Sequence, residues 1–125
     1  MLFRSYTLLT NKSGAVVAPS ADSFQAAAAN ADWAHSDGYY LILTDQAGAR
    51  SWPITGASFI LVYKQPDDAA SVNEALKFFA WAYKDGASMA AELDYVTLPP
   101  ALISQVQKTW TTQVTSGGHP VWSGK

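Results

Sequence analysis

Two histidines, His35 and His119, are the side chains in this sequence whose charge changes most easily near neutral pH. Each stands in a polar, loop-like stretch, and neither has an acidic or histidine partner at the spacing of a metal site. One interpretation makes each a metal ligand or proton carrier, whereas the plainer one is a solvated loop histidine. We favour the plainer interpretation, so the sequence predicts no metal site.

Motifs that position a nucleophile, a metal or a nucleotide do not occur: there is no G-x-S-x-G, H-E-x-x-H, Walker or G-x-G-x-x-G pattern. Acidic residues such as Asp67, Asp68 and Asp85 stand at expected helix starts or turns, where capping accounts for them. General acid–base catalysis needs two carboxylates that converge in one cleft. We therefore predict no catalytic residue, no cofactor, and a chain that is not an enzyme in its own right.

Two other groups allow a binding interpretation. Backbone N–H groups of Ser116-Gly117-Gly118 could hold an anion, but no helix follows them, so we expect a flexible tail. The aromatic cluster of Phe78, Phe79, Trp81 and Tyr83 could line a ligand pocket, but its helical spacing favours a core face. Trp81 lies off the main stripe, so we expect it to be partly exposed.

The composition limits the class of protein. With 125 residues the chain has room for one small domain, and 49 % apolar and 13 % aromatic residues supply a core. A net charge of −2 makes a nucleic-acid partner unfavourable. No apolar stretch approaches the ~20 residues that span a bilayer, and cysteine is lacking, which excludes disulfides and thiolate chemistry.

The first half of the chain alternates short extended and helical patterns. Residues 6–9 and 15–18 flank a polar turn with Gly14, which predicts a hairpin. A helix is expected after Pro19, capped by Ser20 or Asp22. The apolar run Tyr39–Leu43 is typical of a strand.

The second half is predicted to place helices on a strand. Phe59–Val62 is apolar on successive positions, which is typical of a strand covered on both faces. After Pro66 a long helix should begin at Asp67 or Asp68 and dock on this strand. The apolar face of that helix would consist of Val72, Leu76, Phe79 and Tyr83. A short helix is expected from Ser88 to Leu93, and a last one from Pro100 with Leu102, Ile103, Val106 and Trp110 on its apolar face.

Three stretches resemble the C-terminal region of the phosphate-binding protein of the ABC-type phosphate importer, a periplasmic solute-binding protein family. They are residues 17–33, residues 51–64 and, most tellingly, Leu76 to Pro99 with its string Leu-Lys-Phe-Phe-Ala-Trp-Ala-Tyr-Lys-Asp-Gly. The resemblance extends from Tyr6 onward. Residues 1–5 do not match and are interpreted as a non-native start.

The resemblance implies an α/β fold: a C-terminal fragment of a two-lobe, type II periplasmic-binding-protein fold, with a mixed sheet and flanking helices. By the same resemblance, residues 1–50 would end the second lobe. Residues 51–125 would cross the hinge and complete the first lobe.

The function implied is capture of inorganic phosphate outside the cytoplasm, in the periplasm or on a lipid anchor, for delivery to the ABC permease subunits of the importer. The family grips phosphate with an Arg followed by Ser-Gly-Thr, among other groups. Neither Arg4 nor Arg50 is followed by that sequence, so no phosphate-binding residue is expected within this chain. The alternatives are a binding protein for another small oxyanion, a phosphatase-like enzyme, or a pure interaction module.

Overall fold

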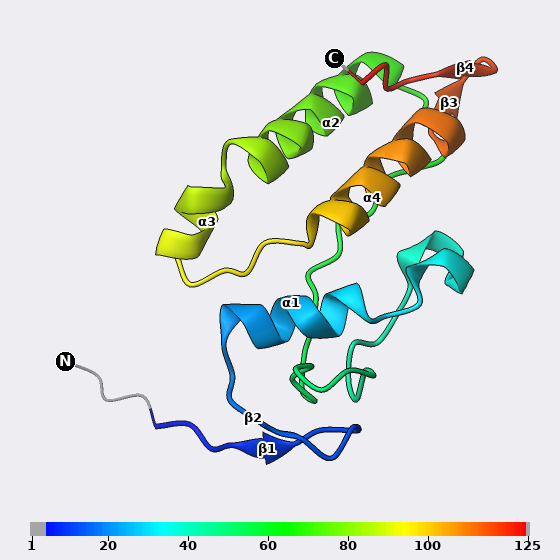
Figure 1. The fold of residues 1–125 in the computed structure, drawn as a ribbon. Helices are drawn as coiled ribbons and strands as arrows, with labels where there is room; N and C mark the ends of the chain where they lie inside the picture. Colours follow the sequence, from blue (N-terminus) through cyan, green and yellow to red (C-terminus); the bar gives the residue numbers. More distant parts are fainter. Residues whose placement is uncertain (1–4, 125) are drawn as a thin grey trace. The chain divides into compact units, whose positions relative to one another are not determined.

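The structure, a computed structural model, describes residues 5–124. The non-native start expected at residues 1–5 therefore lies, except for Ser5, outside the described residues. The chain divides into two compact units, Met1–Ser58 and Phe59–Lys125. Figure 1 labels their helices and strands. No helix within residues 5–124 combines the length and apolar character that crossing a membrane requires.

The first unit opens with a hairpin of β1 (Leu9–Thr10) and β2 (Val16–Val17), which pair antiparallel with Leu9 opposite Val17. Gly14 has a φ of 79°, a left-handed conformation that costs glycine little, and its N–H donates to the Asn11 carbonyl at 2.9 Å. The structure confirms the predicted hairpin, although each strand is only two residues long.

Helix α1 (Ala21–Ala29) follows the hairpin and confirms the predicted helix. Ser20 is its N-cap: the Ser20 hydroxyl accepts from the Ser23 N–H at 3.2 Å, and the Ser23 hydroxyl accepts from the Ser20 N–H at 2.9 Å. This reciprocal pair satisfies two backbone donors that helix geometry leaves without partners. The buried residues of the helix are Ser23 near its start and Ala27 and Ala28 near its end, and their small side chains permit close packing.

The strand predicted at Tyr39–Leu43 is wrong. Two short 3-10 helices, η1 (Trp33–His35) and η2 (Asp37–Tyr39), lead into an irregular segment, and only Thr44 forms a single bridge with Ile54. Leu43 is buried at 3 % exposure, whereas its neighbours Tyr40 and Ile42 are exposed. The apolar run anchors one side chain in the core, and no ladder of hydrogen bonds forms along it. Its apolar character reflects burial at one point rather than strand structure.

Three helices of the second unit agree with the sequence patterns. They are α2 (Ala69–Lys84), α3 (Ala87–Glu92) and α4 (Pro100–Gln113), and α2 and α4 run side by side in Figure 1. Asp68 is the N-cap of α2, and its carboxylate accepts from the Ser71 N–H at 3.0 Å. Pro100 occupies the first turn of α4, where a backbone N–H is not needed.

The core of this unit confirms the predicted face of α2. Leu76 is fully buried and lies in one cluster with Trp110, Val114 and Trp122. Partly buried apolar side chains surround the cluster, among them Val62, Val72, Phe79, Tyr83 and Val106. The Trp110 ring stacks on Tyr83 at a centroid distance of 6.1 Å and meets Trp122 edge-on at 5.7 Å. Half-buried in this packing, Tyr83 has its pKa raised by desolvation.

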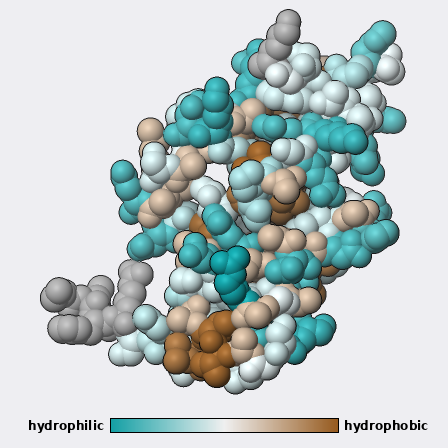
Figure 2. Space-filling model, in the orientation of Figure 1, coloured by the Kyte–Doolittle hydropathy of each residue, from teal (hydrophilic) through white to brown (hydrophobic). Residues whose placement is uncertain are grey.

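The strand predicted at Phe59–Val62 does not form, and the described residues contain no mixed sheet. Within residues 5–124 the sheets are two-stranded and antiparallel, and neither includes this segment. Phe59, Ile60 and Leu61 are 50 %, 55 % and 95 % exposed, and only Val62 packs against the core. A strand needs a neighbouring strand to satisfy its backbone groups, and in the described part of the chain this segment is paired with none. Figure 2 shows hydrophobic surface between hydrophilic side chains on one face of the molecule.

The flexible tail expected after Thr115 is instead a hairpin of β3 (Thr115–Ser116) and β4 (His119–Pro120). Gly117 and Gly118 both have positive φ, 58° and 81°, as a tight two-residue turn requires. The Val121 N–H donates to the Val114 carbonyl at 2.9 Å. This bond helps to bring Trp122 into the core at 5 % exposure.

Candidate functional site

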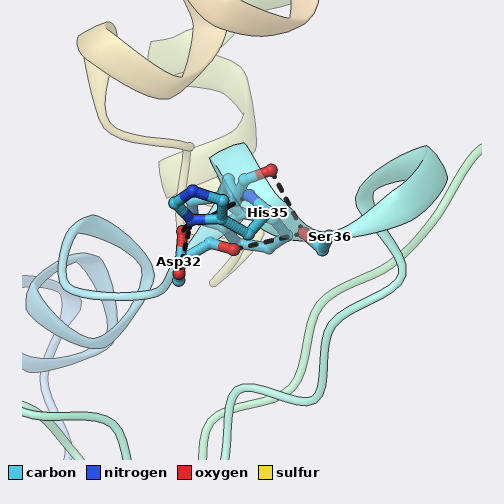
Figure 3. A network of polar contacts seen from close by, with 4 residues as sticks. Asp32, His35 and Ser36 are labelled. Atoms are coloured by element: carbon cyan, nitrogen blue, oxygen red, sulfur yellow. Dashed lines mark hydrogen bonds and ion pairs between the residues drawn. The ribbon is translucent and has the colours of Figure 1, made fainter.

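His35 has an acidic partner that the sequence reasoning missed. Its ring Nδ1 lies 2.8 Å from both carboxylate oxygens of Asp32 (Figure 3), three residues earlier. Asp32 is the N-cap of η1, which places the two side chains on the same turn. The hydrogen bond from His35 lowers the pKa of Asp32. Partners of His35 were considered only at the spacing of a metal site, so this contact was overlooked, and the spacing of three residues at a short helix was the signal for it.

Ser36 completes this polar cluster without forming a catalytic arrangement. Its hydroxyl donates to the backbone carbonyls of Asp32 at 3.3 Å and Trp33 at 3.1 Å (Figure 3), so it is directed to the backbone and not to the His35 ring. Nucleophilic catalysis needs the base within hydrogen-bond reach of the nucleophile. The His35 and Asp32 side chains are 84 % and 67 % exposed, so no water-excluding pocket surrounds them. The cluster holds a loop in place.

Asp68 and Asp85 stand at opposite ends of α2, and His119 belongs to the β3–β4 hairpin. His119 is exposed in β4, Asp68 caps α2, and Asp85 ends that helix. Among residues 5–124, no three His, Cys, Asp or Glu side chains come together in a group that could hold a metal ion. The Ser116-Gly117-Gly118 segment forms the β3–β4 turn, and its glycines serve hairpin geometry.

Asn11 is the centre of a buried polar network that sequence reasoning treated as a simple turn. Its Nδ2 group lies 3.1 Å from each of the carbonyls of Gly48, Ala49 and Ser51, and its Oδ1 accepts from the N–H groups of Ser13 and Ala15. The residue is 6 % exposed. Its amide is therefore fully used in joining the hairpin to the loop before Trp52, and it is not a free ligand for an anion.

Arg50, the arginine in the described part of the chain, is exposed and has no Ser-Gly-Thr after it. The aromatic cluster divides as the sequence predicts: Phe79 and Tyr83 pack on the core, whereas Trp81 is 45 % exposed. Phe78 departs from the core position expected for the cluster, since it is 57 % exposed and lies against Trp81 at a ring distance of 5.9 Å.

A groove between α2 and α4 was not anticipated. Its lining includes Lys77, Trp81 and Lys84 from α2 and Ile103 and Lys108 from α4. The spacing of the α2 residues was visible in the sequence, but the approach of Lys108 depends on how the two helices pack.

Comparison with known proteins gives the relationship that the geometry alone does not. The phosphate-binding protein PstS of Xylella fastidiosa (strain 9a5c) is 46 % identical over 109 residues, 87 % of this chain and 30 % of the relative. PstS of Pasteurella multocida (strain Pm70) is 45 % identical over 119 residues, 94 % of this chain and 35 % of the relative. PstS of Haemophilus influenzae (strain ATCC 51907 / DSM 11121 / KW20 / Rd) is 43 % identical over 106 residues, 85 % of this chain and 32 % of the relative.

No protein-family model matches the chain. The chain spans about a third of the length of the curated relatives it matches. Identity of 43–46 % over most of a chain is well above what unrelated sequences share. The resemblance seen in the sequence is therefore confirmed: this chain is related to the phosphate-binding proteins over nearly its whole length and corresponds to about one third of theirs.

Proposed function

We propose that this chain is part of an extracytoplasmic substrate-binding protein that captures inorganic phosphate for an ABC importer. The observation that carries the proposal is the 43–46 % identity to proteins named phosphate-binding proteins. Those names favour phosphate over another small oxyanion. They also favour a binding protein over a phosphatase-like enzyme or a pure interaction module.

In this proposal the chain supplies parts of two lobes that close on the anion. Residues 1–50 would end the second lobe, and residues 51–125 would cross the hinge and complete the first. The protein would work in the periplasm, or on a lipid anchor outside the cytoplasm, and would deliver phosphate to the permease subunits of the importer.

In the same proposal, the anion ligands lie outside this chain. Anion sites that grip phosphate combine convergent N–H groups with an arginine. Arg50 is exposed, and the amide of Asn11 is occupied by carbonyls of its own unit. The role of this chain is then to complete the fold that holds those ligands.

Titration calorimetry tests both parts of the proposal. The full-length protein should give a saturable one-site isotherm with phosphate in the micromolar range or tighter, and sulfate should compete weakly. The isolated chain should give no saturable signal, and Arg50→Ala in the full-length protein should leave phosphate affinity unchanged. A full-length protein that ignores phosphate would overturn the function. A saturable isotherm from the isolated chain would overturn only the placement of the ligands.

A further inference from the structure

The groove between α2 and α4 combines positive charge with exposed aromatic surface. Lys77, Trp81 and Lys84 follow one another at spacings of four and three along α2, so their side chains share one face of the helix. Ile103 and Lys108 line the opposite wall on α4. The groove therefore has two helical walls, with cations on both of them.

The charge of the groove differs from that of the chain. Three lysines line it and, among the lining residues that the structure describes, there is no carboxylate, although the whole chain carries a net charge of −2. Lys77 is bound to Glu74, with 2.7 Å between Nζ and Oε1. Lys84 and Lys108 are exposed. A local excess of positive charge attracts and orients an acidic partner more strongly than a neutral one.

The aromatic part of the groove fits a polypeptide better than a small anion. Trp81 is 45 % exposed, and its neighbour Phe78, on the same helix, is 57 % exposed, with the two rings 5.9 Å apart. Tryptophan is enriched among the residues that dominate protein–protein binding energy. A nucleic acid would call for a denser basic surface than three lysines.

We propose that this groove binds an acidic amphipathic helix of a partner protein. The apolar face of that helix would cover Trp81 and Ile103, and its carboxylates would meet Lys84 and Lys108, as in other helix-in-groove complexes. The proposal is independent of phosphate capture, which the proposed function assigns to residues outside this chain.

The experiment uses the full-length protein and a fluorescein-labelled peptide of repeated Leu-Glu-Glu-Leu blocks as the probe. Fluorescence anisotropy should show saturable binding with a Kd of about 1–100 µM. The Kd should rise as salt is added, because salt screens the charges. The double variant Lys84→Glu and Lys108→Glu should weaken binding by at least about tenfold, and Trp81→Ala by a similar factor. The matched control is Lys64→Glu, an exposed lysine of the same unit outside the groove lining, which should leave the Kd within about twofold.

A second measurement covers the case in which another part of the full-length protein occupies the groove. The fluorescence of Trp81 is taken as the difference in tryptophan fluorescence between the parent protein and Trp81→Phe. Acrylamide should quench this difference if the groove is open to solvent. A quenched signal together with charge-dependent peptide binding supports the proposal. The proposal is overturned if Trp81 is shielded, if the peptide does not bind, or if Lys64→Glu weakens binding as much as the double variant. Self-association of the protein through the groove, detected by sedimentation, would overturn it as well.

Discussion

Replacing Trp122 by Ala is the sharpest test of the packed C-terminal hairpin. The indole is 5 % exposed and meets Trp110 edge-on at 5.7 Å. A tryptophan buries about 150–250 Å², and at about 25 cal/mol per Å² this corresponds to about 4–6 kcal/mol for the whole side chain. Since alanine keeps part of that area, the variant should lose about 3–5 kcal/mol of unfolding free energy.

Urea unfolding of the full-length protein measures this loss, and Trp81→Ala is the matched control. Trp81 is on the same unit but 45 % exposed, so its replacement should cost less than about half as much. Hydrogen exchange adds a local probe, because the Val121 N–H donates to the Val114 carbonyl at 2.9 Å. That amide should be protected in the parent protein and should lose protection in Trp122→Ala. A loss below about 1 kcal/mol, or an unprotected Val121 amide, would show that the tail is mobile and the packing argument wrong.

Three further outcomes follow from the contacts. Asn11→Ala should lose about 1–3 kcal/mol in urea unfolding, because it leaves buried N–H and carbonyl groups without partners, whereas Lys12→Ala beside it should change little. Hydrogen bonds from Ser71 lower the pKa of Asp68 from its ordinary value of 3.8. The ionised cap therefore stabilises α2 in full at pH values above 3.8, and this stabilisation is lost as the pH falls through the lowered pKa. Asp68→Asn keeps an acceptor without titrating, so its acid unfolding curve should be shallower; an unchanged curve would exclude this role for the carboxylate. The isolated chain, which exposes residues 59–61, should self-associate or unfold without one sharp transition, and a monomer with a single cooperative transition would contradict this.

Helices were predicted well because their signals are local. Ser20, Asp68 and Pro100 each mark a helix start, and the structure has α1, α2 and α4 beginning directly after or at these residues. A helix makes its backbone hydrogen bonds within one segment, so capping residues and a periodic apolar face are sufficient evidence for it. The face that includes Leu76 and Phe79 was found for the same reason.

The misses concern contacts between distant residues. Asn11 bonds to carbonyls 37–40 residues away, and nothing near it in the sequence indicates those partners. Trp122 stands in a polar stretch, so the composition indicated a flexible tail, whereas the Trp122 ring packs in the core beside Trp110. The Asp32–His35 contact is the exception, since its spacing of three residues was readable. Lys108 reaches the groove only through the packing of α2 and α4.

The segment Phe59–Leu61 shows why strands are harder to predict from part of a protein. Its residues have the apolar, β-branched and aromatic character of a buried strand, yet their side chains are 50–95 % exposed and no strand forms among them. A strand's backbone groups must be satisfied by another segment, so strand structure depends on residues that can be far away in the sequence. The relatives that match this chain are about three times its length, and the proposed function places this segment inside a lobe. The apolar sequence and the exposed conformation are then compatible. The sequence suits a segment that is buried in the whole protein, whereas the conformation is that of this chain by itself.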